Sequence, residues 1–444
     1  MASTDIQRTF GTPTNAKKYT FSMWLKRNST GVIDWISSAP GDFSNITFDA
    51  NDRIDWAEYT SGYKYRIVTT RKFRDPAAWY HICFTFDSTL AEAGDRQRLY
   101  INGVEETVFT TDTNPTLNYD TVMNSAVLHA IGSQEGEGYA NYGYGILLSH
   151  VHFIDGTAYP ASTFGETDST SGIWKIKTSP TVTYGDNGFF IFKDNASVTD
   201  QSGEGNNWTA SNGTLTATED NPSNNFCTGN PLDNYYQEAN YSTGNNTVEL
   251  TQPGGNHGYC SSTLGVAAGL WYFEAKPTTG DVRAVGFVDI LQPDSSENIG
   301  QGGTGSSFCF KQTGQTKQGG SSTAYGNTYS TDDIIGCYLD LTANKAYFAI
   351  NGTVQNSGTG LAITAADSTT TGFYKPGADS TNGSDTTWQF NFGNGYFGTT
   401  AVTSAVADAG GIGAFEYDPS AGTFDSASKD FRAICTKNIK AYGG

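Results

Sequence analysis

Apolar and polar side chains alternate in short stretches along the whole chain. In the segment 79–86 (WYHICFTF), Tyr80, Ile82, Phe84 and Phe86 fall on one side of an extended backbone. A period of two is typical of a β-strand with one buried face. Similar patterns predict strands at 99–101, 144–155, 188–193, 285–288, 307–310, 335–341, 345–350 and 388–392. The chain is therefore predicted to consist mainly of short strands.

The alternation in the segment 270–276 (LWYFEAK) predicts a strand with one buried face and one outward face. Trp271 and Phe273 should face a core, whereas Tyr272 and Glu274 should face outward. We therefore expect Trp271→Ala to destabilise the protein distinctly more than Tyr272→Ala.

Turn signals separate the predicted strands. Asn-Gly pairs at 102–103 and 351–352 end two of them, and both residue types accept the positive φ that tight hairpins need. A helix-like pattern occurs in one short window, 426–434. Many short strands joined by turns predict an all-β protein built from antiparallel sandwiches.

Composition and charge exclude several classes of protein. The formal charge is −19, which argues against a nucleic-acid partner bound through its phosphates and against a basic membrane-surface protein. No stretch approaches the roughly 20 apolar residues of a membrane span, so we expect no membrane insertion. The N-terminus lacks an apolar core behind a basic start, which predicts synthesis in a cytoplasm. The six cysteines form no CxxC pair, so we expect them to be reduced, mostly buried and free of zinc.

A change of composition divides the chain. Residues 195–235 are rich in Asn, Gly, Ser and Pro, yet they contain Trp208, Phe226 and Leu232, which need something to pack on. We interpret 195–235 as an ordered connector. It would separate one sandwich at 1–194 from a second at 236–397, followed by a tail at 398–444 that is rich in Ala and Gly and has few apolar anchors.

The first half contains a series of blocks whose order and spacing are specific, at 21–26, 79–82, 95–104, 131–133, 145–156 and 164–166. In these blocks it resembles a laminin-G-like, concanavalin A-like module of the kind carried by phage structural proteins. The connector, with its DNPSNNFCT and NPLD motifs, resembles segments that follow this module in marine phage proteins.

The second half resembles a SPRY-like domain, in LWYFE at 270–274, VGF at 285–287, the segment 336–352 and FNFG at 390–393. Together the resemblances imply two tandem concanavalin A-like sandwiches of the jelly-roll type. They also imply a bacteriophage virion protein of the marine or cyanophage kind, either a tail-fibre component or a capsid fibre or decoration. The implied location is the virion, after synthesis in the host cytoplasm. The implied partners are other virion proteins, further copies of this chain and a host-surface polysaccharide.

The spacing of the carboxylates bears on enzymatic activity. Glycanases with this type of sandwich carry two carboxylates on one strand, roughly 5–5.5 Å apart when they retain configuration. The nearest run is 53–58, in which Arg53 stands where the first glutamate would be, before Asp55 and Glu58. We therefore expect no catalytic residues and no enzymatic activity. A glycan hydrolase remains the disfavoured alternative, and a purely structural virion protein is the other.

Metal binding has weak support in the sequence. His150 and His152 would share a strand face, but no third ligand is evident, so Val151 and Phe153 are expected to face the core and the histidines to face outward. Some laminin-G modules bind calcium through loop carboxylates, and the corresponding candidates are Asp49, Asp52, Asp112 and Asp120. We expect no metal and no cofactor, with calcium as the alternative.

Aromatic residues give the positive signal. Flat rings beside hydrogen-bond acceptors suit the C–H faces and hydroxyls of sugars. The glycan-binding candidates are Trp35, Trp56, Tyr59, Tyr63 and Tyr65, with Tyr139 and Tyr142 in a second aromatic loop. The alternative is that strand alternation places half of the rings in the core. The leading hypothesis is thus a non-enzymatic surface protein that binds a host glycan.

Overall fold

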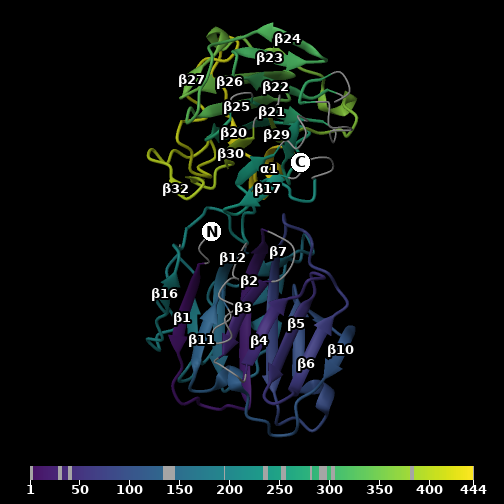
Figure 1. Ribbon diagram of the computed structural model, residues 1–444, viewed down its shortest axis with the longest axis vertical. Helices are drawn as coiled ribbons and strands as arrows, with labels where there is room; N and C mark the ends of the chain where they lie inside the picture. The colour runs from purple at the N-terminus through teal and green to yellow at the C-terminus, as the bar shows by residue number, and fades with distance from the viewer. Residues whose placement is uncertain are drawn as a thin grey trace. The chain divides into compact units, whose positions relative to one another are not determined.

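The computed structural model describes residues 4–28, 33–38, 43–133, 146–194, 196–233, 239–251, 257–280, 283–289, 298–301, 306–380 and 385–443, with the side chains of 33–38 left out. Strands make up most of the regular structure in these ranges (Figure 1). The one α-helix among them is α1 (Thr436–Tyr442). No helix in the described part of the chain is long and apolar enough to cross a membrane. The all-β prediction is confirmed, but the window predicted as helical lies just before α1 and is not helical.

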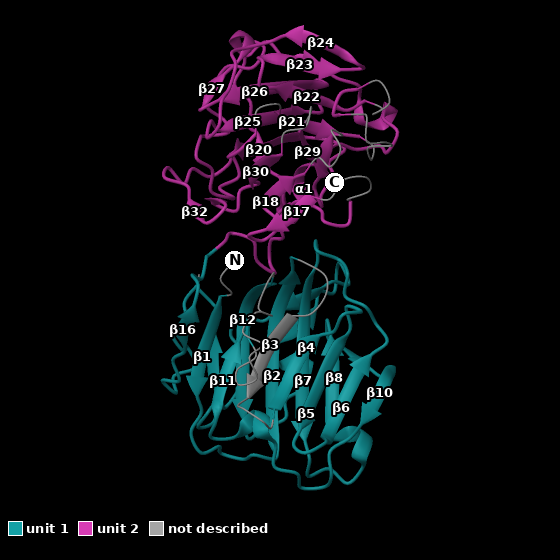
Figure 2. Ribbon diagram, in the orientation of Figure 1, with its two compact units in different colours: residues 1–217 teal, residues 218–444 magenta. Residues whose placement is uncertain are grey.

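The chain folds into two compact units, residues 1–217 and 218–444 (Figure 2). The division falls inside the segment predicted as an ordered connector. Trp208, from the first part of that segment, is buried in the core of the first unit. Phe226, from its second part, is buried in the second unit. Leu232, which was also expected to pack, is largely exposed.

The first unit is a sandwich of two antiparallel sheets. The eight-stranded sheet has the order β10 (Phe109–Thr113), β6 (Tyr63–Thr69), β5 (Ile54–Tyr59), β4 (Phe43–Phe48), β3 (Ile33–Ser38), β11 (Leu128–Ile131), β1 (Asp5–Thr9), β16 (Thr209–Asn212). The six-stranded sheet has the order β15 (Phe189–Ile191), β12 (Ile146–Asp155), β2 (Lys18–Arg27), β7 (Trp79–Asp87), β8 (Gln97–Ile101), β9 (Val104–Glu106). Ile46 and Trp56 from the first sheet pack with Phe21, Phe84 and Phe153 from the second in one core.

A small hairpin covers the outer face of the six-stranded sheet. It consists of β13 (Gly165–Thr167) and β14 (Trp174–Ile176). The Trp174 ring packs over Gly103, where an added Cβ would lie 2.3 Å from it. Asn102 and Gly103 both have positive φ, as predicted for this turn. Because of this cover, β2 is almost completely buried on both faces.

The second unit is also a sandwich. One sheet has the order β17 (Ala239–Ser242), β18 (Thr247–Leu250), β30 (Thr386–Asn391), β20 (Leu270–Pro277), β25 (Ile335–Asp340), β26 (Lys345–Ile350), β27 (Thr353–Val354), with β28 (Leu361–Ala362) also on β26. The other has the order β19 (Gly258–Ser261), β29 (Lys375–Ser380), β21 (Arg283–Val288), β22 (Phe308–Lys311), β23 (Gln315–Gln318), β24 (Ser321–Ala324). A separate pair joins β31 (Tyr396–Phe397) to β32 (Thr400–Ala401).

The C-terminal segment forms a third layer of the second unit. Its strand β33 (Arg432–Ala433) pairs with β20 in parallel. Phe415, Phe424 and Phe431 are fully buried against Tyr272 and Tyr338 on the outer face of the larger sheet. The expectation of few apolar anchors in this segment was wrong, because three aromatic rings spaced along it are enough to cover the sheet.

The side chain of Glu274 binds the C-terminal segment to the larger sheet. The carboxylate is fully buried and accepts hydrogen bonds from the backbone N–H groups of Glu416 (3.0 Å) and Tyr417 (2.8 Å). It also accepts from Asn391 Nδ2 (2.9 Å) and the Tyr272 hydroxyl (3.0 Å). Burial nevertheless raises the pKa of Glu274 to about 7. The side chain points away from the main core, as predicted, but toward the third layer and not toward solvent.

The six cysteines are all buried and free, as expected of reduced thiols.

The covering layer predicts that Trp271 and Tyr272 are similarly important for stability. Each ring is fully buried, on opposite faces of β20. Trp271→Ala and Tyr272→Ala should each lower the free energy of unfolding by about 3–5 kcal/mol, measured by urea denaturation. The control Leu232→Ala removes a side chain that is 56 % exposed. This substitution should change the free energy of unfolding by less than about 0.5 kcal/mol. A Tyr272→Ala effect as small as the control's would contradict the assignment of the third layer.

Candidate functional site

Two of the predicted aromatic candidates belong to the core. Trp56 and Tyr65 have no exposed surface, and Trp56 Nε1 donates a hydrogen bond to the Tyr19 hydroxyl (3.0 Å). Both rings lie on the inner face of the eight-stranded sheet, since Trp56 alternates with the outward-facing Asp55 and Ala57 along β5. Neither ring is available to a ligand, so their assignment to a glycan site was wrong.

Tyr59 and Tyr63 lie on the outer face of the same sheet. They are 37 % and 48 % exposed. Tyr63 would face inward like Tyr65 if the strand were regular, but the pairing of β5 with β6 shifts between Glu58 and Tyr59 and places Tyr63 directly opposite Tyr59. This β-bulge brings the two rings together, with centroids 5.3 Å apart and planes at 84°.

Phe43 is a third member of this group that the sequence did not single out. It pairs with Tyr59 across β4 and β5, and the two rings stack at 5.6 Å with planes 11° apart. Phe43, Tyr59 and Tyr63 thus form one row across three neighbouring strands, called here the aromatic row. Trp35 lies on β3, whose side chains are not described, and Tyr139 and Tyr142 lie outside the described residues.

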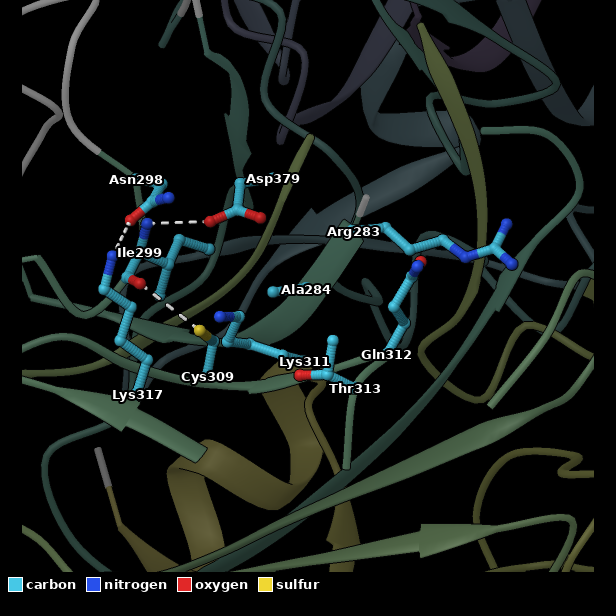
Figure 3. A pocket seen from close by; sticks show the side chains of 10 residues that line it. All are labelled: Arg283, Ala284, Asn298, Ile299, Cys309, Lys311, Gln312, Thr313, Lys317 and Asp379. Carbon is cyan, nitrogen blue, oxygen red and sulfur yellow. Dashed lines mark hydrogen bonds between the residues drawn. The ribbon is translucent and has the colours of Figure 1, made fainter. Parts of the chain in front are cut away.

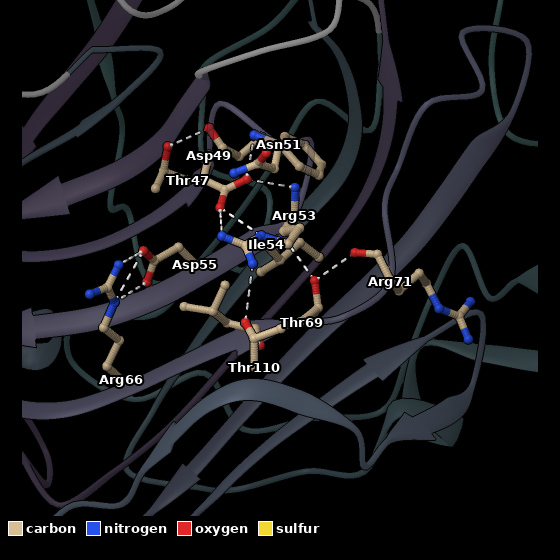
Figure 4. A network of polar contacts seen from close by, with 12 residues as sticks. Thr47, Asp49, Asn51, Arg53, Ile54, Asp55, Arg66, Thr69, Arg71 and Thr110 are labelled. Atoms are coloured by element: carbon tan, nitrogen blue, oxygen red, sulfur yellow. Dashed lines mark hydrogen bonds and ion pairs between the residues drawn. The ribbon is translucent and has the colours of Figure 1, made fainter.

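A second, polar row runs beside the aromatic row. Asn45, Ala57 and Arg66 are paired across β4, β5 and β6. The Arg66 guanidinium lies over the Tyr63 ring, 4.6 Å from its centroid. It also binds the Asp55 carboxylate, with Nη2 2.5 Å from Oδ2, as Figure 4 shows. Hydrogen bonding to Asp55 raises the pKa of Arg66, so this charge is fixed in place.

The loop carboxylates named as calcium candidates are already engaged. Asp49 accepts from the Arg53 guanidinium (2.5 and 2.8 Å) and from the backbone N–H groups of Asn51 and Arg53 (Figure 4). Burial acts to raise its pKa, but these hydrogen bonds hold the pKa of Asp49 below its usual value. Asp52 is bound by two arginines, Arg27 (3.1 Å) and Arg74 (3.0 Å).

The other two candidates lie in separate surroundings. Asp112 accepts from Asn114 Nδ2 (3.2 Å), and Asp120 pairs with Lys17 (2.6 Å). Among the described residues, no group of three or more His, Cys, Asp or Glu side chains is placed to hold a metal ion. The four carboxylates therefore do not converge on a calcium site in this structure.

Asp55 and Glu58 point to opposite faces of β5. Asp55 faces outward, whereas the Glu58 carboxylate is buried inside the sandwich. Glu58 accepts from the hydroxyls of Tyr119 (2.5 Å), Thr121 (2.6 Å) and Tyr65 (3.2 Å) and from the Val122 N–H (2.9 Å). Burial raises its pKa. The two carboxyl groups cannot flank one glycosidic bond, and Glu58 instead holds the 119–122 loop against the sheet.

The histidines of the six-stranded sheet are held by aromatic neighbours. Trp174 Nε1 donates to His81 Nδ1 (3.0 Å), so His81 Nε2 carries the proton and donates to Ser22 Oγ (2.9 Å). His81 therefore has no free nitrogen with which to activate Ser22 as a nucleophile. Burial lowers the pKa of His81 to about 3, so the ring is neutral.

His152 and His150 differ in environment because of a bulge. His152 stacks on Phe190 at 3.9 Å, and its Nδ1 lies 2.9 Å from the Tyr184 hydroxyl. His150 has a positive φ of 48° at the register shift in β12, so the two rings do not share one regular face. Val151 and Phe153 are in the core, as predicted.

Comparison with protein families agrees with the two sandwiches. Residues 3–157 match the family described as the concanavalin A-like lectin/glucanases superfamily. Residues 270–374 match the SPRY domain family. The chain carries a concanavalin A-like domain followed by a SPRY domain.

Three solved structures show a similarity to parts of this chain. The SPRY domain of human HERC1 is 15 % identical over 36 % of this chain and 96 % of its own, with a TM-score of 0.30. The heptameric SAP-like pentraxin from Limulus polyphemus is 15 % identical over 43 % of this chain and 89 % of its own, with a TM-score of 0.29. The TRIM65 PSpry domain is 18 % identical over 37 % of this chain and 91 % of its own, with a TM-score of 0.27.

The buried position of Glu58 predicts a structural effect of its substitution. In Glu58→Gln, an amide NH₂ would face hydroxyl and N–H donors, so the variant should lose about 1–3 kcal/mol of unfolding free energy in the first unit. Thermal melting followed by near-ultraviolet circular dichroism would measure this loss. Glu92→Gln changes an exposed glutamate and should melt like the parent protein. Equal melting of the two variants would show that Glu58 does not hold the 119–122 loop.

Proposed function

We propose that this protein is a non-enzymatic binding protein whose concanavalin A-like domain binds a carbohydrate on the outer face of its eight-stranded sheet. The observation that supports this proposal is the aromatic row of Phe43, Tyr59 and Tyr63, which three neighbouring strands hold beside the charged Arg66.

The chemistry of the face suits a sugar. Tyr59 and Tyr63 offer apolar ring surface for the C–H groups of a pyranose, and their hydroxyls offer hydrogen bonds. In the polar row, the Asn45 side chain is partly exposed and makes no hydrogen bond to another described residue, so its amide is available to sugar hydroxyls. Ala57, which is paired between Asn45 and Arg66, is itself buried, so the exposed part of this face is the aromatic row and its polar neighbours.

Binding at a single patch of this size would be weak. A dissociation constant of about 1 mM corresponds to roughly −4 kcal/mol. Several copies on one particle would raise the effective affinity by about 10²–10⁴. We therefore propose that the chain acts as a homo-oligomer on the surface of a bacteriophage virion, as a tail-fibre component or a capsid fibre or decoration, with host-surface polysaccharide as its ligand. The virion setting is supported by the resemblance of the first half and of the connector to phage proteins.

Substitutions in the aromatic row test the carbohydrate proposal. Tyr63→Ala and Tyr59→Ala should each weaken binding to immobilised marine cyanobacterial surface polysaccharide by about tenfold, a loss of roughly 1.4 kcal/mol per site. Biolayer interferometry would measure it, with melting recorded beside it. The matched control is Tyr442→Ala, which removes a tyrosine that is 49 % exposed in the other unit.

Three outcomes would count against this proposal. Binding that the row variants and the control weaken equally would place the site elsewhere. No binding of the multivalent protein to any host polysaccharide would favour a purely structural role. Reducing ends released from the polysaccharide would show that the protein is a hydrolase.

The virion proposal has its own test. Particles purified from a culture of a phage that encodes this chain should contain it in many copies, detected by mass spectrometry. Antibodies raised against the chain should label the particle exterior in negatively stained images. A chain found in the lysate but not in particles banded on a density gradient would contradict this proposal while leaving carbohydrate binding untouched.

A further inference from the structure

A cavity lies on the outer face of the smaller sheet in the SPRY-containing unit. Its volume is about 70 Å³. Residues from β21, β22, β23 and β29 line it together with Asn298 and Ile299 from the loop above (Figure 3). A single water needs roughly 10–15 Å³ of such volume, so the cavity has room for a group of several non-hydrogen atoms.

The strand register explains why the cavity exists. Ala284 on β21 is paired on one side with Asp379 on β29 and on the other side with Lys311 on β22. The three side chains therefore share one face of the sheet, and the short alanine leaves a gap between the carboxyl group and the lysine. Strands lie about 4.8 Å apart, so the two outer backbones are separated by roughly 10 Å. Figure 3 shows Asp379 and Lys311 on either side of Ala284.

The loop above the gap is fastened to the sheet. Asp379 Oδ2 accepts a hydrogen bond from the Ile299 N–H (2.8 Å), and the Cys309 thiol donates to the Ile299 carbonyl (3.2 Å), as drawn in Figure 3. Lys317 Nζ donates to Asn298 Oδ1 (2.5 Å) and to Gln301 Oε1. These bonds fix the position of the Asp379 carboxyl group.

Polar atoms at the cavity lack partners. Asp379 is 1 % exposed, and its second oxygen, Oδ1, accepts no hydrogen bond within the described structure. Gln312 Oε1 is buried without a partner as well. The Lys311 ammonium makes neither a hydrogen bond nor an ion pair with any described residue. A buried polar atom without a partner costs about 1–3 kcal/mol, which a ligand that pairs with it would recover.

The charges around the cavity favour an anion. Two lysines, Lys311 and Lys317, line it against one acidic residue, Asp379, although the chain as a whole carries a formal charge of −19. The Arg283 guanidinium points away from Ala284 and donates to the Thr279 and Gly280 carbonyls. We propose that the cavity binds a carboxylate group, with one ligand oxygen accepting from Lys311 and the other accepting a hydrogen bond from protonated Asp379 at Oδ1.

Binding of the carboxylate is coupled to the uptake of one proton. Binding takes a proton from solvent onto Asp379 Oδ1, and this proton then lies between the two carboxyl groups, which share one negative charge opposite Lys311. Other titratable groups around Asp379 are Tyr259 on β19, Cys309 on β22, Lys317 on β23 and Tyr329. Burial raises the pKa of Asp379 to about 7 and holds the two tyrosines and the thiol uncharged near neutral pH. Asp379 is therefore the group whose charge changes between pH 6 and 8.

Sodium acetate is the probe for this site. Saturation-transfer NMR on the full chain should detect acetate at pH 6, and the affinity should fall about tenfold by pH 8 as Asp379 loses its proton. Asp379→Asn supplies a permanent N–H donor in place of the protonated carboxyl group and keeps an acceptor for Ile299. This variant should bind acetate equally at both pH values, which a merely structural role for Asp379 does not predict.

Other variants keep the test decisive if Asp379→Asn does not fold. Lys311→Gln removes a partly exposed charge and should weaken acetate binding at least tenfold at pH 6, whereas Lys437→Gln, at an exposed lysine of the same unit, should not change it. Ala284→Leu should fill the gap and abolish binding.

A comparison of acetate with the larger glucuronate distinguishes the two sources of the carboxylate group. Binding of both acetate and glucuronate would assign the site to acidic sugars, and binding of acetate alone would assign it to small free acids. No acetate signal at pH 6, equal affinity of the parent protein at pH 6 and 8, or binding unaffected by Lys311→Gln would overturn the proposal. None of these results depends on the aromatic row of the other unit.

Discussion

Both sandwiches depend on covering the second face of a sheet that is already buried on its first. In the first unit, β2 is enclosed between the main core and the layer around β13 and β14. In the second unit, β20 and β25 are enclosed between the main core and the C-terminal segment. The cover of the first unit lies in sequence between β12 and β15 of its own sheet, and the cover of the second unit follows β30. The apolar surface that each cover buries is what holds it in place.

This constraint also determines where a ligand has access. In the concanavalin A-like domain, the hairpin occupies the outer face of the six-stranded sheet, where Trp174 and His81 pack together. The outer face of the eight-stranded sheet keeps exposed aromatic rings at Tyr59 and Tyr63. The functional proposal for this unit thus rests on the exposed rings of this second outer face.

The alternation of side chains was enough to predict the fold class and the inner faces of many strands. It assigned Trp271 and Tyr272 to opposite faces correctly, but it could not reveal that Tyr272 is buried, because the covering rings of Phe415 and Phe424 lie more than a hundred residues later. The alternation could not predict the aromatic row either, for a different reason. A one-residue bulge at Lys64 changes the face on which Tyr63 lies, and no simple periodicity contains that information.

Buried carboxyl groups follow two patterns in this protein. Glu58 and Glu274 each accept four hydrogen bonds, so their role is to hold distant segments of chain. Asp379 has one oxygen engaged and the other without a partner. Equal burial therefore has different consequences, and the number of donors around a carboxyl group separates a structural role from a proposed binding role.

The antiparallel bridge between Phe226 and Cys435 has a consequence for how the second unit could be handled as a module. Two segments near the two ends of this unit lie side by side, since Cys227 N–H donates to the Ile434 carbonyl and Thr436 N–H donates to the Asn225 carbonyl, both at 2.9 Å. Adjacent ends are the geometry that domain insertion and circular permutation require. Tension applied to the two ends would load this short bridge one hydrogen bond at a time, before it reached the strands of the sandwich.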